Sequence, residues 1–328
     1  MKAVLAIIRL FRLPNLVIVS LTQVLPYWFV LRPAILESRG VPVLNSYTFL
    51  LITLATVLTT LGGYVINDYF DRQIDLINKP QRVVWGRYLP ASGALMLYAG
   101  LLTAVHLIAF YLDYDLRSAD RWPLWVFPGV SFLLFLYGWQ FKCTAIVGNF
   151  LVSFLCGIVP IMIIFPESRP LWLSSFQNPV KIQQATSLVW LYALFAFVTN
   201  LLREQIKDLQ DFPGDSACGC NTLAVLKGTR FAKKPAVFTG IAVCILIGIL
   251  LWFWSETDAP LWQISAGSVF LLTPALLATV ILFFAKGVGD YKLASLFVKI
   301  IMFFGLFLLL RSWPDDLFQA IKIYWSKL

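Results

Sequence analysis

Two segments of this chain carry carboxylates at helical spacing, and each follows a long apolar run. Residues 67–75 read NDYFDRQID. At about 100° per residue, Asn67, Asp71 and Asp75 drift by only about 40° per step, so they share one face of a helix. Carboxylates on one face repel one another unless a cation lies among them. Oxygen ligands on a rigid helix suit Mg²⁺ that keeps phosphate oxygens in its shell, so this segment predicts a site for magnesium and phosphate.

The second segment, residues 203–215, reads REQIKDLQDFPGD. Its acids Glu204, Asp208 and Asp211 are spaced i, i+4 and i+7 and also share one helical face. The Pro-Gly pair that follows should end or bend the helix. We therefore expect Asp215 to return from a loop toward the same ion site.

Each segment has a simpler interpretation, in which the acids are solvated loop residues or partners of the neighbouring Arg72 and Lys207. Chance accounts for a single such segment more readily than for two segments in corresponding loops. Soluble isoprenoid synthases hold Mg²⁺ and a diphosphate leaving group between two facing acidic helices, so the chemistry has a physical precedent.

The amino-acid composition and the length of the apolar runs indicate which kind of secondary structure positions these acids. The chain has 328 residues, of which 59% are hydrophobic and 13% are charged. It is therefore too apolar for a soluble domain, and its solvent must be the lipid bilayer. The apolar runs are about twenty residues long, which predicts membrane-spanning helices and not the shorter strands of a barrel. The net charge of +9 is spread over short loops, which argues against nucleic acid as a partner.

The hydropathy pattern predicts an all-α, polytopic membrane helix bundle with about nine transmembrane helices. The expected spans lie at about 13–32, 48–70, 89–112, 123–141, 144–166, 185–206, 235–254, 263–285 and 291–311. The acidic segments follow the second and sixth of them, so the chain resembles two four-helix halves plus one helix. We expect a single transmembrane domain over 1–328, with helices 1–4 at about 13–141, helices 5–9 at about 144–311, and an interfacial amphipathic helix at about 313–328.

Basic residues predict the orientation of the bundle. Most lysines and arginines fall in the connections on the side of the acidic segments, and few fall on the opposite side. The positive-inside rule then places the N-terminus and both acidic segments in the cytoplasm. We expect a multi-pass protein of the cell (inner) membrane.

The cysteines offer little evidence for a metal site. They fall mostly inside or beside apolar runs, at Cys143, Cys156, Cys218, Cys220 and Cys244. Cys218 and Cys220 have one residue between them, which is not a metal spacing. The sequence predicts neither disulfides nor zinc.

At this point the chain resembles a known family, the UbiA-type intramembrane prenyltransferases. Residues 67–75 are similar to its first motif, and residues 203–215 resemble its second motif in the subgroup that contains digeranylgeranylglyceryl phosphate synthases. Further landmarks are the first-helix start at 12–15, the run 78–82 after the first motif, Tyr137, Lys142, and Gly148-Asn149.

The resemblance implies nine transmembrane helices around a cavity capped on the cytoplasmic side, and Mg²⁺-dependent transfer from a polyprenyl diphosphate. It implies these metal ligands: Asn67, Asp71, Asp75, Asp208, Asp211 and Asp215. The expected diphosphate contacts are Asn67, Asp68, Arg72, Arg82 and Glu204, and the expected catalytic residues are Tyr137, Lys142, Arg203 and Lys207. The segment 83–85 departs from the Pro-rich and Ser-rich continuation of many members, which leaves the acceptor open.

The basic residues also have simpler interpretations. Lys142 is placed to neutralise charge on a leaving diphosphate, or it anchors a helix end at the interface. The arginines and Lys207 either bind phosphate or follow the positive-inside rule.

The function that these observations favour is transfer of a polyprenyl chain, best matched by geranylgeranyl, to a lipophilic acceptor. The second motif favours a prenylglyceryl phosphate, and an aromatic quinone or chlorophyll-type precursor is the alternative. The rival function from another class is a secondary transporter coupled to cations. That function predicts acids near the membrane midplane and broken helices, whereas the acids of this chain lie at the cytoplasmic ends of the predicted helices. A non-catalytic scaffold leaves both acidic segments unexplained.

Overall fold

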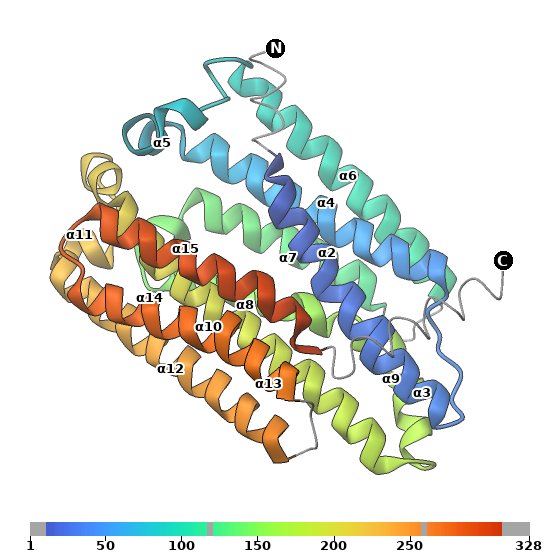
Figure 1. Ribbon diagram of the computed structural model, residues 1–328. Coiled ribbons are helices and arrows are strands. Elements are labelled where there is room, and N and C mark those ends of the chain that lie inside the picture. Colours follow the sequence, from blue (N-terminus) through green and yellow to red (C-terminus); the bar gives the residue numbers. More distant parts are fainter. Residues whose placement is uncertain (1–10, 117–120, 257–260, 310–328) are drawn as a thin grey trace.

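The computed structural model describes residues 11–116, 121–256 and 261–309, and they form a bundle of long helices (Figure 1). A helix satisfies its own backbone polar groups, which is what a chain in hydrocarbon requires. The predicted membrane helix bundle is confirmed. Two strands of two residues each are the exception to the all-α prediction, within the ranges described.

The first half of the bundle is built around α4. Its elements are α2 (Leu13–Pro26), the π-helical turn η1 (Tyr27–Leu31), α3 (Arg32–Glu37), α4 (Ser46–Phe70), α6 (Ala91–Leu116) and α7 (Trp122–Trp139). Asn45 caps α4, because its side chain accepts hydrogen bonds from the backbone N–H groups of Tyr47 and Thr48. Helix α4 packs against α2, α6 and α7 and ends at the first acidic segment.

The second half is built around α10, which extends over 39 residues. Its elements are α8 (Val147–Ile161), α9 (Ile164–Ser175), α10 (Pro179–Ala217), α12 (Thr229–Glu256), α13 (Leu261–Gly267), the π-helical turn η4 (Ser268–Leu272), α14 (Thr273–Phe284), α15 (Val288–Gly305) and η5 (Leu306–Leu309). Helix α10 packs against α8 on one side and against α12 and α15 on the other. It therefore belongs to both large hydrophobic clusters of the bundle.

The predicted count of nine spanning helices is not confirmed. Among the described residues, seven helices are long and apolar enough to cross a membrane, or eight if the bent pair α8 and α9 is one span. These two helices meet at 47°. Helix α15 covers the ninth predicted stretch but carries Asp290, Lys292 and Lys299, so it is more charged than a typical span. The predicted interfacial helix at 313–328 lies outside the described residues.

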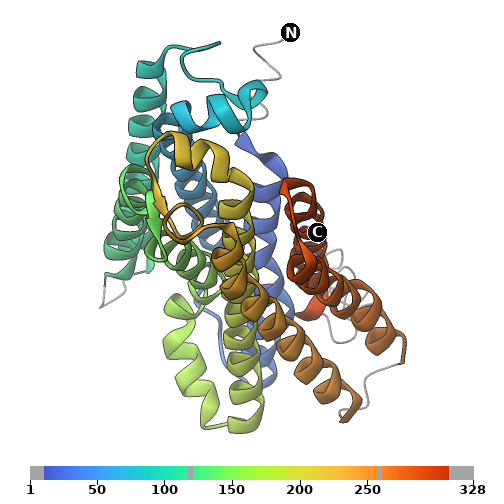
Figure 2. The same ribbon diagram turned by 90° about the vertical axis from the view of Figure 1, so that its left-hand side faces the viewer.

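Short elements gather at the end of the bundle that carries the acidic segments (Figures 1 and 2). They are α5 (Arg72–Asn78), the 3-10 turns η2 (Pro80–Arg82) and η3 (Phe141–Cys143), β1 (Thr144–Ala145), β2 (Asn221–Thr222) and α11 (Leu223–Lys227). Strands β1 and β2 pair in parallel.

This strand pair corrects the expectation that the chain has no disulfide. Cys143 and Cys220 are joined by a disulfide although 77 positions separate them. They flank β1 and β2, so the pairing of the strands brings the two sulfur atoms together. Sequence spacing gave no indication of this contact.

The opposite end of the bundle is held by a buried carboxylate. Glu167 of α9 is fully buried, and it accepts hydrogen bonds from the Tyr27 hydroxyl at 3.1 Å and from the backbone N–H groups of Val43 and Leu44 at 3.0 and 2.9 Å. Three donors satisfy a charge that would be costly to bury alone. The long loop before α4 is thereby fixed to α9 and η1.

Candidate active site

The first acidic segment lies where α4 passes into α5. Asp71 bends the chain between them, yet helical hydrogen bonding continues from Asp71 N to Asn67 O at 2.9 Å and from Asp75 N to Asp71 O at 2.8 Å. The predicted shared face is therefore confirmed for Asn67, Asp71 and Asp75.

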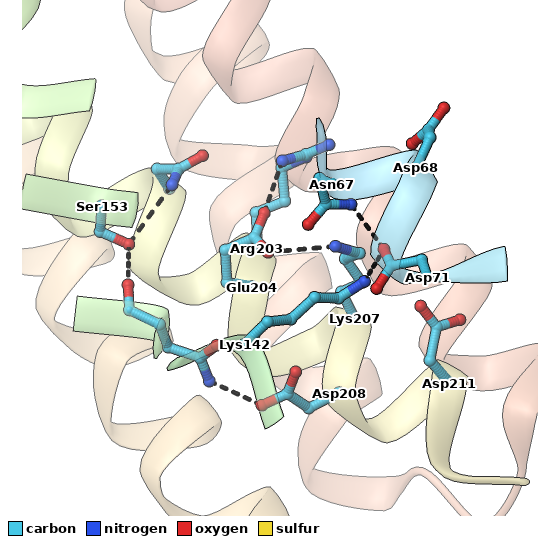
Figure 3. Close-up of polar contacts among 12 residues, drawn as sticks. Asn67, Asp68, Asp71, Lys142, Ser153, Arg203, Glu204, Lys207, Asp208 and Asp211 are labelled. Atoms are coloured by element: carbon cyan, nitrogen blue, oxygen red, sulfur yellow. Dashed lines mark hydrogen bonds and ion pairs between the residues drawn. The ribbon is translucent and has the colours of Figure 1, made fainter. Parts of the chain in front are cut away.

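Asp71 is the centre of this segment. Its Oδ2 atom accepts a hydrogen bond from Asn67 Nδ2 at 2.5 Å. The same oxygen forms an ion pair with the Lys142 ammonium of η3 (Figure 3). Both Asp71 and Asn67 are buried. The Oδ1 atom of Asn67 is also buried and has no hydrogen-bond partner among the described residues, so this oxygen beside the Asp71 carboxylate is available as a ligand.

The second acidic segment is a continuous part of α10, which corrects the expected end at Pro213. The helix runs on to Ala217, so Asp215 lies on it and does not return from a loop. Asn78 of α5 explains this, because it supplies hydrogen bonds on both sides of the proline. Its Nδ2 donates to Asp211 O and its Oδ1 accepts from Gly214 N, each at 2.9 Å.

The two segments are joined directly by Lys79 and Asp211. The Lys79 ammonium lies 2.7 and 2.8 Å from the two carboxylate oxygens of Asp211. Gly214 allows this approach, since a Cβ atom there would lie 2.4 Å from Asn78 Nδ2. Helix α5 consequently packs on the last turns of α10.

Glu204 of α10 is a buried carboxylate that two basic residues neutralise. Arg203 Nη1 lies 2.7 Å from Glu204 Oε1, and Lys207 Nζ lies 3.4 Å from Glu204 Oε2. Tyr137 of α7 is buried near this group, and its interaction with Lys207 and Glu204 is electrostatic. The predicted residues Tyr137, Arg203, Glu204 and Lys207 therefore lie together.

Three acids of the site form no ion pair within the described ranges, namely Asp75, Asp208 and Asp215. Asp208 is held instead by Asn149 of α8, whose Nδ2 donates to Asp208 Oδ2 at 2.7 Å. Burial and then the charge of Asp71 raise the pKa of Asp75.

Two of the residues expected to contact diphosphate, Asp68 and Arg72, have other partners in the structure. Asp68 points away from Asp71 and Lys142 in Figure 3 and is ion-paired with Arg12. The Arg72 guanidinium lies over the Tyr69 ring at 4.8 Å, and its Nε donates to Tyr69 O at 3.1 Å. The Arg82 side chain is outside the described part of the structure.

Three residues of the site were missed as functional candidates. Lys79 and Asn149 lie within landmarks of the family resemblance. That position was the sequence signal that could have identified them, but neither residue was predicted to have a role. Arg12 also lay in a landmark, and nothing in its spacing indicates Asp68 as its partner.

The carboxylates fit a divalent cation shared with a phosphate ligand. Within the described residues, no three acid, histidine or cysteine side chains converge closely enough to hold a metal ion by themselves. Mg²⁺ commonly uses one or two protein carboxylates and completes its shell with water and phosphate oxygens. The free Asn67 oxygen and the three acids without ion pairs are suitable donors for such a shell.

Comparison with known proteins finds a family model and several curated proteins that match most of the chain. The family model described as the UbiA prenyltransferase family matches residues 24–307. A digeranylgeranylglyceryl phosphate synthase of Methanopyrus kandleri is 31% identical over 259 residues, which are 76% of this chain and 82% of that protein.

Solved structures share the fold. One, from work on digeranylgeranylglyceryl phosphate synthase in membranes, aligns with a TM-score of 0.59 at 21% identity, over 94% of this chain and 98% of that one. A UbiA homologue from Archaeoglobus fulgidus bound to GPP and Mg²⁺ aligns with a TM-score of 0.52 at 14% identity, over 94% of this chain and 99% of that one. At these identities the likeness establishes the fold alone.

Proposed function

This chain belongs to the UbiA prenyltransferase family, and on that premise we propose that it transfers an isoprenyl chain from a polyprenyl diphosphate to a lipophilic acceptor. It is a multi-pass membrane protein. We place it in the cell membrane with both acidic segments facing the cytoplasm, in line with its basic connections.

The observation that carries this proposal is the meeting of two acidic helices at one end of an apolar bundle. Asp71 and Asp211 lie on different helices, and each is countered by a lysine. Ammonium groups among carboxylates mark a place where added negative charge is tolerated, which a diphosphate requires.

The ligands of a bound Mg²⁺ would be drawn from Asn67, Asp71, Asp75, Asp208, Asp211 and Asp215. Bound there, Mg²⁺ would draw charge onto the diphosphate and make it a better leaving group. Lys142 would neutralise the negative charge that develops on the leaving group, and Arg203 and Lys207 would hold its oxygens. The allylic C–O bond would then break with carbocation character and diphosphate would leave with the bonding electrons. The acceptor hydroxyl oxygen would bond to the chain, and its proton would pass to the released diphosphate.

The substrates are proposed to be geranylgeranyl diphosphate and a prenylglyceryl phosphate. The name of the Methanopyrus kandleri relative and the second motif both support this acceptor. A bundle in lipid lets the donor hydrocarbon stay in the bilayer while its head reaches the acids. Prenylation of an aromatic precursor is the alternative.

The test incubates the solubilised full chain with labelled geranylgeranyl diphosphate, Mg²⁺ and a panel of acceptors. We expect labelled ether product with prenylglyceryl phosphate, loss of product in excess chelator, and recovery when Mg²⁺ is added. Full turnover in excess chelator would overturn the mechanism. Product with only an aromatic acceptor would favour the alternative. Cation-coupled uptake of a solute into proteoliposomes, without any prenylated product, would favour a transporter.

A further inference from the structure

The connection between α7 and α8 contacts one carboxylate from each acidic segment. Lys142 in η3 is ion-paired with Asp71, and Asn149 in the first turn of α8 donates a hydrogen bond to Asp208. Lys142 was predicted from its charge, whereas Asn149 carries no charge and was assigned no role. Its amide nevertheless holds a carboxylate that has no basic partner among the described residues.

We propose that Asn149 is a positioning residue that sets the direction of the Asp208 carboxylate and thereby the affinity of the site for Mg²⁺-diphosphate. This inference rests on the proposed function. An ionised carboxylate only accepts hydrogen bonds, so it is the amide nitrogen of Asn149 that faces it. With Oδ2 occupied by this donor at 2.7 Å, the second oxygen of Asp208 remains for a ligand.

Two further polar side chains continue this hydrogen-bonded series from the backbone of Asn149 along α8 to α10. Ser153 lies one turn along α8, and its hydroxyl donates to Asn149 O at 2.6 Å. Asn200 of α10 donates from Nδ2 to Ser153 Oγ at 3.3 Å. Asn149, Ser153 and Asn200 are all buried, where unpaired polar groups are costly. The dashed lines in Figure 3 follow this series from Ser153 toward Asp208.

Close packing fixes the register of α8 against its neighbours. A Cβ atom on Gly157 would lie 3.2 Å from Ala193 O, so α8 and α10 approach closely below the polar series. A Cβ atom on Gly148 would lie 2.3 Å from Phe141 O, so the start of α8 also abuts η3. Asn149 is consequently held between the turn that carries Lys142 and the helix that carries Asp208.

The proposal predicts a change in ligand binding that exceeds any change in stability. Without the amide donor, the Asp208 side chain is free to sample other rotamers and must be reordered when the ligand binds. The Asn149→Ala and Asn149→Leu proteins should therefore bind Mg²⁺-pyrophosphate about tenfold more weakly or worse. Asn149→Asp should lose more, because a like charge would face Asp208. Ser153→Ala should shift binding in the same direction by about threefold, since the amide itself remains.

The experiment measures binding of Mg²⁺-pyrophosphate to the solubilised full chain by calorimetry, with the apo melting temperature as a second readout. The matched control is Asn178→Ala, which removes an asparagine that caps the other end of α10 by accepting from Lys181 N at 3.2 Å. It should lower the melting temperature and leave binding unchanged.

Wild-type affinity in a folded Asn149→Ala or Asn149→Leu protein overturns the proposal. A lower melting temperature with unchanged binding also overturns it, because the amide would then only join α8 to α10. If neither variant folds, Ser153→Ala decides the question by the same measurement. Weakened binding in these variants, together with a wild-type protein that transfers no prenyl chain to any acceptor, would refute the proposed function and leave the positioning role intact.

Discussion

The Lys79 ammonium lies between both carboxylate oxygens of Asp211, at 2.7 and 2.8 Å, so the residue that follows the first acidic helix is ion-paired with the second. Both side chains are partly buried, with 29% of Lys79 and 11% of Asp211 exposed. Water screens such a pair less than a surface pair, and the contact sets the distance between α5 and α10.

Replacing Lys79 by methionine should weaken the site more than the fold. The change keeps much of the side-chain volume but leaves Asp211 without its cation, so the two acidic helices repel each other. We expect prenyl transfer to fall by about tenfold or more, equivalent to about 1.4 kcal/mol. Lys292→Met, at an exposed lysine of α15, should retain activity. Equal activity in the two variants would show that the Lys79 ion pair contributes nothing to the site.

Gly214→Ala tests the close approach of α5 to α10. The added methyl group would meet Asn78 Nδ2 at 2.4 Å and displace the residue that hydrogen-bonds on both sides of Pro213. Overpacking of this kind costs about 1–3 kcal/mol, so both the melting temperature and activity should fall.

The control for this change is Gly248→Ala in α12, where, in the described part of the chain, the added Cβ would meet no side chain and no neighbouring helix within 4 Å. Alanine is the better helix former, so Gly248→Ala should leave activity intact and stability equal or slightly higher. A Gly214→Ala protein that matches this control in both measurements would contradict the packing described for Asn78.

Local spacing predicted the helical parts of the site well. Asn67, Asp71 and Asp75 share a face because four residues make nearly a full turn, and this holds even where α4 bends into α5. The helix-ending role expected of Pro213 was wrong, since a side chain from another helix, Asn78, hydrogen-bonds the backbone of α10 on both sides of the proline.

Long-range pairing is the part that sequence could not supply. Lys142 and Asp71 are separated by 71 positions, and Asn149 and Asp208 by 59. Neither pair has a periodicity that links its members, because contacts between helices depend on packing register. The Cys143–Cys220 disulfide was missed for the same reason.

The predicted orientation is tested by labelling single-cysteine variants with a membrane-impermeant maleimide. Cys218 and a Gln73→Cys substitution are exposed at the acidic end, after α10 and in α5, and Asp115→Cys is exposed in the last turn of α6. We expect the first two to react only in inside-out vesicles and the third only in right-side-out vesicles. Reaction of Cys218 and Gln73→Cys from opposite sides would refute the shared cytoplasmic face.

Neutralising one carboxylate at a time separates catalysis from folding. Asp208→Asn keeps the side-chain volume, and its amide oxygen still accepts from Asn149, so stability should change little. Asp71→Asn is different, because it leaves the mostly buried Lys142 ammonium without its carboxylate. We expect it to lower the free energy of unfolding by about 1–3 kcal/mol.

Activity should fall by orders of magnitude in both variants, although only Asp71→Asn loses stability. Each removes a negative charge that would anchor Mg²⁺-diphosphate, and charge stabilisation in the transition state weakens by several kcal/mol. Asp115→Asn is the control, because this exposed acid lies at the far end of α6. Thermal melting and the labelled-donor assay measure the two effects separately. A folded Asp208→Asn protein with near wild-type transfer would mean that the negative charge of Asp208 does not anchor the ligand, and the carboxylates of the second acidic segment would then need another explanation.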